Sequence, residues 1–79
     1  MSKTILDVRT PQEFMMGHVK NSVNIPLQEL ESRLDEVKNL KGEIILCCAS
    51  GVRSARAYSY LKQKGFNKVS NGGSWMDIE

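Results

Sequence analysis

One stretch of this sequence brings together the residue types that a cysteine nucleophile needs. Cys48 is followed at short spacing by Gly51, Arg53 and Ser54. A thiol reacts as its thiolate, and nearby N–H groups, helix N-termini and cations lower its pKa toward neutrality. Arg53 supplies a permanent positive charge. The residue types and their spacing therefore indicate nucleophilic chemistry at Cys48.

The residues on either side of Cys48 predict how the thiol is held. Residues 44–46 are apolar and two of them are β-branched, which is typical of a buried strand. Residues 53–64 are predicted to form a helix with an inner stripe of Ala55, Tyr58 and Leu61 and a C-terminal cap at Gly65. A tight turn from a strand into a helix directs several N–H groups and the positive end of the helix dipole at one point. The predicted anion-binding loop comprises Ala49, Ser50, Gly51, Val52, Arg53 and Ser54.

Four stretches of the chain resemble, in the same order, segments of rhodanese-like sulfurtransferase domains. Residues 5–14 read ILDVRTPQEF and are similar to that family's DVRTPEEF segment, and residues 17–26 contain GHV and NIP. Residues 48–54 match its active-site loop C-x-x-G-x-R-S, and residues 65–75 are similar to its closing pattern of GF, V, GG and W. The resemblance extends from Ile5 to Trp75.

The resemblance implies a thiosulfate sulfurtransferase that works by double displacement. The Cys48 thiolate attacks the outer sulfur of a donor such as thiosulfate or a persulfide, and the loop N–H groups hold the resulting persulfide. An acceptor, cyanide or a thiol, then takes the sulfur. Arg53 and Arg56 are expected to attract the anionic donor. A sulfur-carrier or thioredoxin-like protein is a further candidate partner, and no cofactor or metal is expected.

Two other functions stay open at this point. Cysteine-dependent phosphatases use C-x5-R, and Arg53 has that offset from Cys47, but Gly51 is then misplaced and Leu46 stands where those enzymes carry histidine. Counted from Cys48, the loop is one residue too short to encircle a phosphate. The second alternative is a non-catalytic rhodanese-like binding module, whose inactive members typically lack the loop cysteine that this chain has.

Several polar residues near the N-terminus are candidates for supporting roles. Asp7 and Arg9 stand at the end of a strand predicted over residues 4–8, and we expect them to brace the loop through ion pairs without reacting. Thr10 and Glu13 fit a capping box at the start of a short helix. His18 has the chemistry of a general base, but a hydrogen-bonded turn residue is the favoured interpretation.

Cys47 has two interpretations of its own. As the last residue before Cys48 in a strand, it is expected to be buried with its side chain facing away from Cys48. The alternative is a resolving thiol that forms a strained vicinal disulfide with Cys48. Two adjacent cysteines make a poor disulfide framework, which favours a reducing, cytoplasmic compartment.

The alternation of strands and helices predicts an α/β fold. Further short strands are predicted at residues 23–25 and 68–70, an amphipathic helix of three to four turns at residues 27–37, and a turn at residues 71–74. In parallel sheets ligands bind beyond the carboxyl ends of the strands, where Cys48 would lie. The prediction is a rhodanese-like three-layer α/β/α fold with a small parallel sheet of about four strands, without the family's usual N-terminal strand.

Composition sets limits on the class of protein. The chain has 79 residues, predicted as one domain over residues 1–79, with 41% hydrophobic and 25% charged residues and a formal charge of +2. This charge, without any block of like charges, argues against a nucleic-acid partner. No apolar run suggests a membrane span or a signal peptide. Because one sheet edge is expected to be poorly covered, we expect a monomer or a weak dimer.

Overall fold

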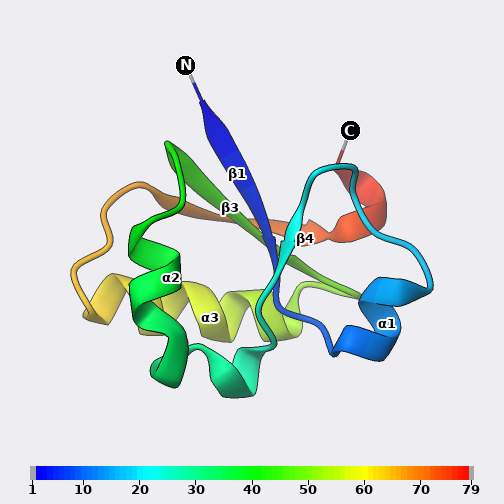
Figure 1. Cartoon of the computed structure of the whole chain (residues 1–79), viewed down its shortest axis with the longest axis horizontal. Helices are drawn as coiled ribbons and strands as arrows, with labels where there is room; N and C mark the ends of the chain where they lie inside the picture. The colour runs from blue at the N-terminus through cyan, green and yellow to red at the C-terminus, as the bar shows by residue number, and fades with distance from the viewer. Residues whose placement is uncertain (1, 79) are drawn as a thin grey trace.

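Four parallel strands form the sheet of this protein, in the order β2-β1-β3-β4 (Figure 1). The computed structural model describes residues 2–78. The strands are β1 (Lys3–Asp7), β2 (Val23–Asn24), β3 (Glu43–Cys48) and β4 (Val69–Ser74). Because β3 pairs on both sides, its carboxyl end, which carries Cys48, lies between β1 and β4. The predicted α/β fold with about four parallel strands is confirmed.

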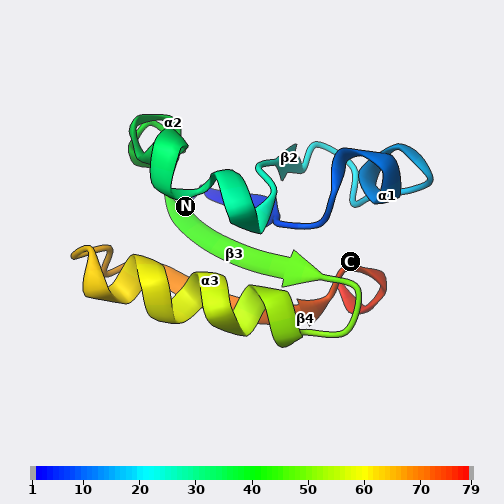
Figure 2. The ribbon, with the colours of Figure 1, turned by 90° about the horizontal axis from the view of Figure 1, so that it is seen from below.

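Helical segments connect the strands. The α-helices are α1 (Pro11–Met15), α2 (Leu34–Lys38) and α3 (Val52–Gln63), and the 3₁₀ segments are η1 (Leu27–Glu29), η2 (Glu31–Arg33) and η3 (Trp75–Asp77). In Figure 1, α2 and α3 lie below the sheet, and Figure 2 shows both helices on the near side when the molecule is seen from below. The C-terminal η3 lies at the other side of the sheet (Figure 1).

The hydrophobic core lies between the sheet and the helices α2 and α3. Its strand residues include Leu6 of β1 and the alternate residues Ile44, Leu46 and Cys48 of β3. On the helical side the core contains Leu30, which lies between η1 and η2, and Val37, Ala57 and Leu61 of the helices. Each fully buried aliphatic side chain of this kind stabilises the fold by about 1.5–3 kcal/mol. The strand that ends on Cys48 is therefore anchored along its length by the core.

The prediction of a single helix over residues 27–37 is wrong, because the segment is divided into η1, η2 and α2. The interruption lies at Arg33, whose backbone angles of φ −122° and ψ 27° fall outside the helical region. The Ser32 hydroxyl also donates to the carbonyl of Glu29, a local bond that competes with regular helix formation. The apolar spacing still buries Leu30 and Val37, so the periodicity predicted the burial but not the helix.

The inner face of α3 differs by one residue from the predicted stripe of Ala55, Tyr58 and Leu61. Ala55 is exposed, whereas Ser54, Ala57 and Leu61 are buried. The polar Ser54 belongs to the inner face because it lies against the thiol at the start of the helix. The predicted ending of the helix is confirmed: Gly65 has φ 93°, and the N–H of Phe66 donates to the Leu61 carbonyl.

The prediction of a turn at residues 71–74 is wrong, because β4 continues through these residues to Ser74. The register shifts there: Leu46 pairs with Asn71 and Cys48 pairs with Ser74, so β4 has one more residue than β3 over this interval. At Gly72 a Cβ atom would lie 2.8 Å from Ile45 Cγ2 and 3.1 Å from the Leu46 carbonyl oxygen. Only glycine fits this close approach of β4 to β3.

Candidate active site

The loop after β3 directs backbone N–H groups at the Cys48 sulfur. The N–H of Gly51 donates to Cys48 Sγ at 3.0 Å, and the N–H of Ser54 does so at 3.4 Å. Gly51 reaches this position with φ 100°, in the left-handed region that favours glycine. Cys48 itself is only 1% exposed. The N–H groups of Gly51 and Ser54 thus converge on one buried sulfur atom.

The surroundings of Cys48 act on its pKa in opposite directions. Burial raises the pKa of the thiol because it disfavours the charged thiolate. The hydrogen bond between the Cys48 and Ser54 side chains lowers the pKa, as do hydrogen bonds from the N–H groups of Ser54, Gly51 and Ser50. These bonds outweigh burial, so the pKa of Cys48 lies below its ordinary value. The site favours the nucleophilic form of the thiol through dipoles.

Asn71 of β4 holds the Ser54 hydroxyl beside the thiol. Ser54 Oγ lies 3.5 Å from Cys48 Sγ, 3.1 Å from the Gly51 carbonyl oxygen and 2.7 Å from Asn71 Oδ1. Asn71 Oδ1 also accepts from the N–H of Gly73 at 3.0 Å. Sequence reasoning assigned Asn71 only to a turn. No local signal could have found this contact, since it depends on the bulge in β4.

The guanidinium group of Arg53 forms an ion pair with Glu13 of α1. Arg53 Nη1 lies 2.7 Å from Glu13 Oε1, and Nη2 lies 2.9 Å from Oε2. Arg53, with further hydrogen bonds from Thr10, lowers the pKa of Glu13 to about 2, so the carboxylate is charged at neutral pH. The predicted capping box of Thr10 and Glu13 is also present. Glu13 therefore joins α1 to the loop, a role that the capping pattern did not reveal.

Asp7 and Arg9 form a buried ion pair at the carboxyl end of β1. Arg9 Nε donates to both carboxylate oxygens of Asp7 at 2.9 and 3.0 Å, and Arg9 Nη2 donates to Asp7 at 2.7 Å and to the Gly17 carbonyl at 2.7 Å. The Arg9 guanidinium also stacks on the Trp75 ring, with 4.5 Å to its centroid. These contacts tie together β1, the segment after α1 and η3. That the pair also braces the loop stays a prediction.

We expect the substitution Asp7→Ala to destabilise the fold strongly. Asp7 is 0% and Arg9 4% exposed, so the substitution leaves a buried cation without its partner. Breaking such a pair costs about 3–5 kcal/mol in the free energy of unfolding, measurable by urea denaturation. Asp35→Ala, at an exposed position of α2, is the matched control with a small expected effect. Equal losses in the two variants would contradict the bracing role.

His18 is the hydrogen-bonded residue after α1 that the sequence favoured. Its Nδ1 lies 2.7 Å from the Phe14 carbonyl oxygen, and its ring stacks on the Phe14 ring with centroids 3.7 Å apart. These contacts explain the position of His18 by local structure. They give no support to its use as a general base.

Cys47 lies next to the reactive thiol in sequence but in a different environment. It is fully buried and stands outside the core cluster that contains Cys48. Burial, followed by the charge of Asp7, raises the pKa of Cys47 to about 12. Both cysteines are free thiols. Cys47 is therefore protonated at neutral pH and agrees with the structural interpretation.

Arg56 lies one helical turn beyond the loop. Together with Gln28, Glu31 and Tyr60, it lines a hollow of about 360 Å³ between α3 and η1, whose apolar lining is Leu27 and Leu30. The structure does not bring Arg56 into the hydrogen-bonding group around Cys48. Its expected part in attracting an anionic donor remains a prediction.

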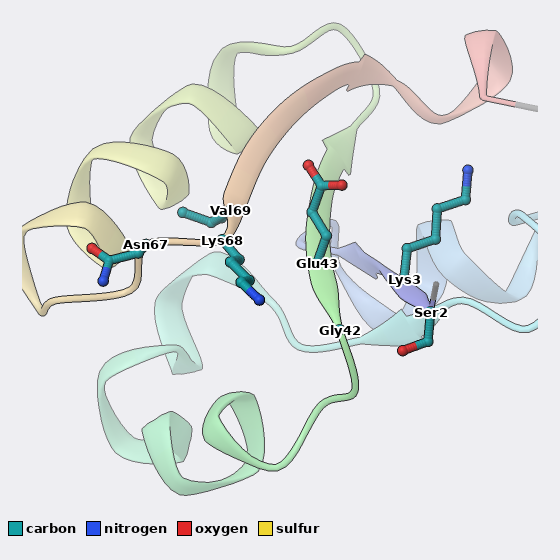
Figure 3. A pocket seen from close by; sticks show the side chains of 7 residues that line it. All are labelled: Ser2, Lys3, Gly42, Glu43, Asn67, Lys68 and Val69. Carbon is teal, nitrogen blue, oxygen red and sulfur yellow. The ribbon is translucent and has the colours of Figure 1, made fainter.

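The larger hollow on the described residues lies at the other end of the sheet. It has a volume of about 780 Å³, and Figure 3 shows the side chains around it. Its lining consists of Ser2, Lys3, Gly42, Glu43, Asn67, Lys68 and Val69. These residues stand at the amino ends of β1, β3 and β4. The hollow and Cys48 therefore lie at opposite ends of β3.

Two further properties were searched over residues 2–78. No group of three or more His, Cys, Asp or Glu side chains in this part of the chain is arranged to hold a metal ion. None of the helices described here has the length and hydropathy to cross a membrane.

In this chain a buried strand of a parallel sheet ends on a thiol that accepts hydrogen bonds from backbone N–H groups. This arrangement defines a class of cysteine-dependent α/β domains. Residues 1–76 match the family described as Rhodanese-like domain. The chain belongs to the rhodanese-like family, as the sequence motifs predicted.

Individual relatives agree with this assignment. The chain is 32% identical over 74 residues to "Thiosulfate sulfurtransferase PspE" of Escherichia coli (strain K12), covering 92% of this chain and 71% of PspE. It is 44% identical over 70 residues to "Putative sulfur carrier protein YrkF" of Bacillus subtilis (strain 168), covering 89% of this chain but only 37% of YrkF. The solved structure "rhodanese with anions from E. coli" superposes with a TM-score of 0.87 at 31% identity, covering 98% of this chain and 92% of that one.

Proposed function

We propose that this protein is a sulfurtransferase that carries sulfane sulfur as a persulfide on Cys48. The observation that carries the proposal is that the buried Cys48 sulfur accepts hydrogen bonds from the N–H groups of Gly51 and Ser54. Membership of the rhodanese-like family and the similarity to PspE support the same chemistry. Thiosulfate is the proposed test donor, and cyanide or a thiol is the acceptor.

The first half-reaction loads the sulfur. The Cys48 thiolate attacks the outer sulfur of thiosulfate, a new S–S bond forms, and the original S–S bond breaks with its electron pair leaving on sulfite. The outer sulfur becomes the terminal, negatively charged atom of the persulfide. The loop N–H groups from Ala49 to Ser54 are proposed to stabilise this charge, because fixed dipoles in a buried site require no reorganisation during the reaction.

The second half-reaction unloads the sulfur. Cyanide or a thiolate attacks the terminal sulfur, and the electron pair of the broken S–S bond returns to Cys48 as thiolate. The hydrogen bonds that lower the pKa of Cys48 make it a better leaving group at this step. The same loop therefore assists both halves of the cycle.

The test is direct loading with thiosulfate. Thiosulfate should increase the mass of the intact protein by one sulfur atom, and cyanide should remove that atom and yield thiocyanate. The Cys48→Ser variant should gain no mass. Absence of the added sulfur on a folded wild-type protein would contradict the proposal and favour a binding module.

The same preparation tests the phosphatase alternative. The Arg53 guanidinium that a phosphatase would use to bind phosphate is paired here with Glu13. We therefore expect hydrolysis of p-nitrophenyl phosphate to stay at background. Clear turnover that is lost in Cys48→Ser would overturn sulfur transfer in favour of phosphoryl chemistry.

A further inference from the structure

The positive charge of Arg53 in the loop is balanced by the carboxylate of Glu13 in α1. Arg53 is 34% and Glu13 36% exposed, so the ion pair lies at the surface of the molecule. Both carboxylate oxygens of Glu13 are within 2.9 Å of guanidinium nitrogens, in a two-point pairing. Arg53 thus presents a neutral pair in place of a free cation.

Of the two neighbouring arginines, Arg9 is paired with a carboxylate and Arg56 stands outside the hydrogen-bonded group around Cys48. Arg9 is paired with the buried Asp7 and donates to the Gly17 carbonyl, so its charge is also balanced. Arg56 lies in the hollow between α3 and η1. The groups that contact the Cys48 sulfur are the Ser54 side chain and the N–H groups of Gly51 and Ser54.

We propose that Glu13 is a specificity-determining residue that sets which charge of sulfur donor the loop prefers. By neutralising Arg53, Glu13 removes the attraction that would favour a dianion such as thiosulfate over a donor with a single negative charge. This inference rests on the sulfurtransferase function proposed above. It assigns to α1 a part in choosing the substrate, through a contact between residues 40 positions apart.

Two donors of similar size isolate the effect of charge. Thiosulfate carries two negative charges, and methanethiosulfonate, in which a methyl group replaces one oxygen, carries one. Attack of the Cys48 thiolate on the outer sulfur yields the same persulfide from both, with sulfite or methanesulfinate leaving with the electron pair of the broken bond. The difference between the two leaving groups is the same for every variant, so a change in the ratio of the two donors' kcat/KM values between wild type and variant reports donor charge.

The test variant is Glu13→Gln, measured with both donors and saturating cyanide. Glutamine keeps a carbonyl oxygen that can accept from Thr10, so the capping box is retained, but it leaves the charge of Arg53 unbalanced. We expect the ratio of kcat/KM for thiosulfate to that for methanethiosulfonate to rise about fivefold. The rise should shrink at high salt, since exposed charges are screened.

Glu29→Gln is the matched control, because it removes a carboxylate from another exposed arginine pair, with Arg33. The ratio should not change in this variant. An unchanged ratio in Glu13→Gln, or an equal rise in the control, would overturn the inference.

A measurement on the wild type gives an independent test if Glu13→Gln does not fold. With Arg53 neutralised, the wild-type ratio should change by less than about twofold from low to high salt. A steep fall would mean that Arg53 acts as a free cation and would overturn the inference. If neither donor loads Cys48 in the wild type, the proposed function itself fails, which is a different outcome from an unchanged ratio.

Discussion

Replacing Cys48 with serine should abolish sulfur transfer from thiosulfate, with a loss of about a thousandfold or more. A serine hydroxyl has no accessible anionic form at neutral pH and cannot hold a persulfide sulfur. The hydrogen bonds from Gly51 and Ser54 would then surround an unreactive oxygen. The measurement is thiocyanate formation from thiosulfate and cyanide, with the unfolding transition of each variant recorded to show that the fold is retained.

Cys47→Ser is the matched control, because it makes the same exchange of sulfur for oxygen one residue earlier. Cys47 is buried and its pKa of about 12 keeps it protonated, so the variant should lose some stability but keep most of the activity. If Cys47→Ser were inactive and Cys48→Ser active, the assignment of the nucleophile would be wrong by one residue.

Alkylation should separate the two cysteines by a large factor. The pKa of Cys48 lies below its ordinary value of 9.0, whereas that of Cys47 is raised to about 12. The thiolate fractions at pH 8 therefore differ by about a thousandfold, since each pKa unit is a factor of ten. Iodoacetamide at this pH should modify Cys48 first, as read by peptide mass spectrometry. Modification of Cys47 at a similar rate would contradict this description of the site.

The Ser54→Ala variant extends the alkylation experiment. Removing the hydroxyl removes one hydrogen bond that stabilises the thiolate, so the pKa of Cys48 should rise and the rate profile should move to higher pH. We expect the rate at neutral pH to fall about tenfold. Ser59→Ala, at an exposed position of the same helix, should leave the profile unchanged. An unchanged profile in Ser54→Ala would mean that the backbone N–H groups alone tune the thiol.

Features encoded by neighbouring residues could be predicted from the sequence. The strand, turn and helix around Cys48 occupy one continuous segment, so apolar runs and glycine spacing were sufficient to place the loop. The capping box of Thr10 and Glu13 and the ending at Gly65 were also correct, because caps depend on residues within one or two turns. The alternation of strands and helices predicted the parallel sheet for the same reason.

The errors arose where packing overrides local preference. The apolar spacing of residues 27–37 is compatible with one helix, but the chain forms η1, η2 and α2 while burying the same side chains. The glycines after Asn71 suggested a turn, yet pairing with β3 keeps the segment in the sheet as a bulged strand. Propensity is a weak guide when another element supplies the hydrogen bonds.

The sequence by itself was sufficient to predict Cys48 as the nucleophile, the loop that follows it and the sheet on which the loop is built. Tertiary structure alone decided that Glu13 neutralises Arg53 and that Asn71 holds the Ser54 hydroxyl beside Cys48. These partners are 40 and 17 residues apart, and no spacing rule connects them. They meet because parallel strands bring the ends of β1, β3 and β4 to one edge of the sheet, where the electrostatics of the thiol are set.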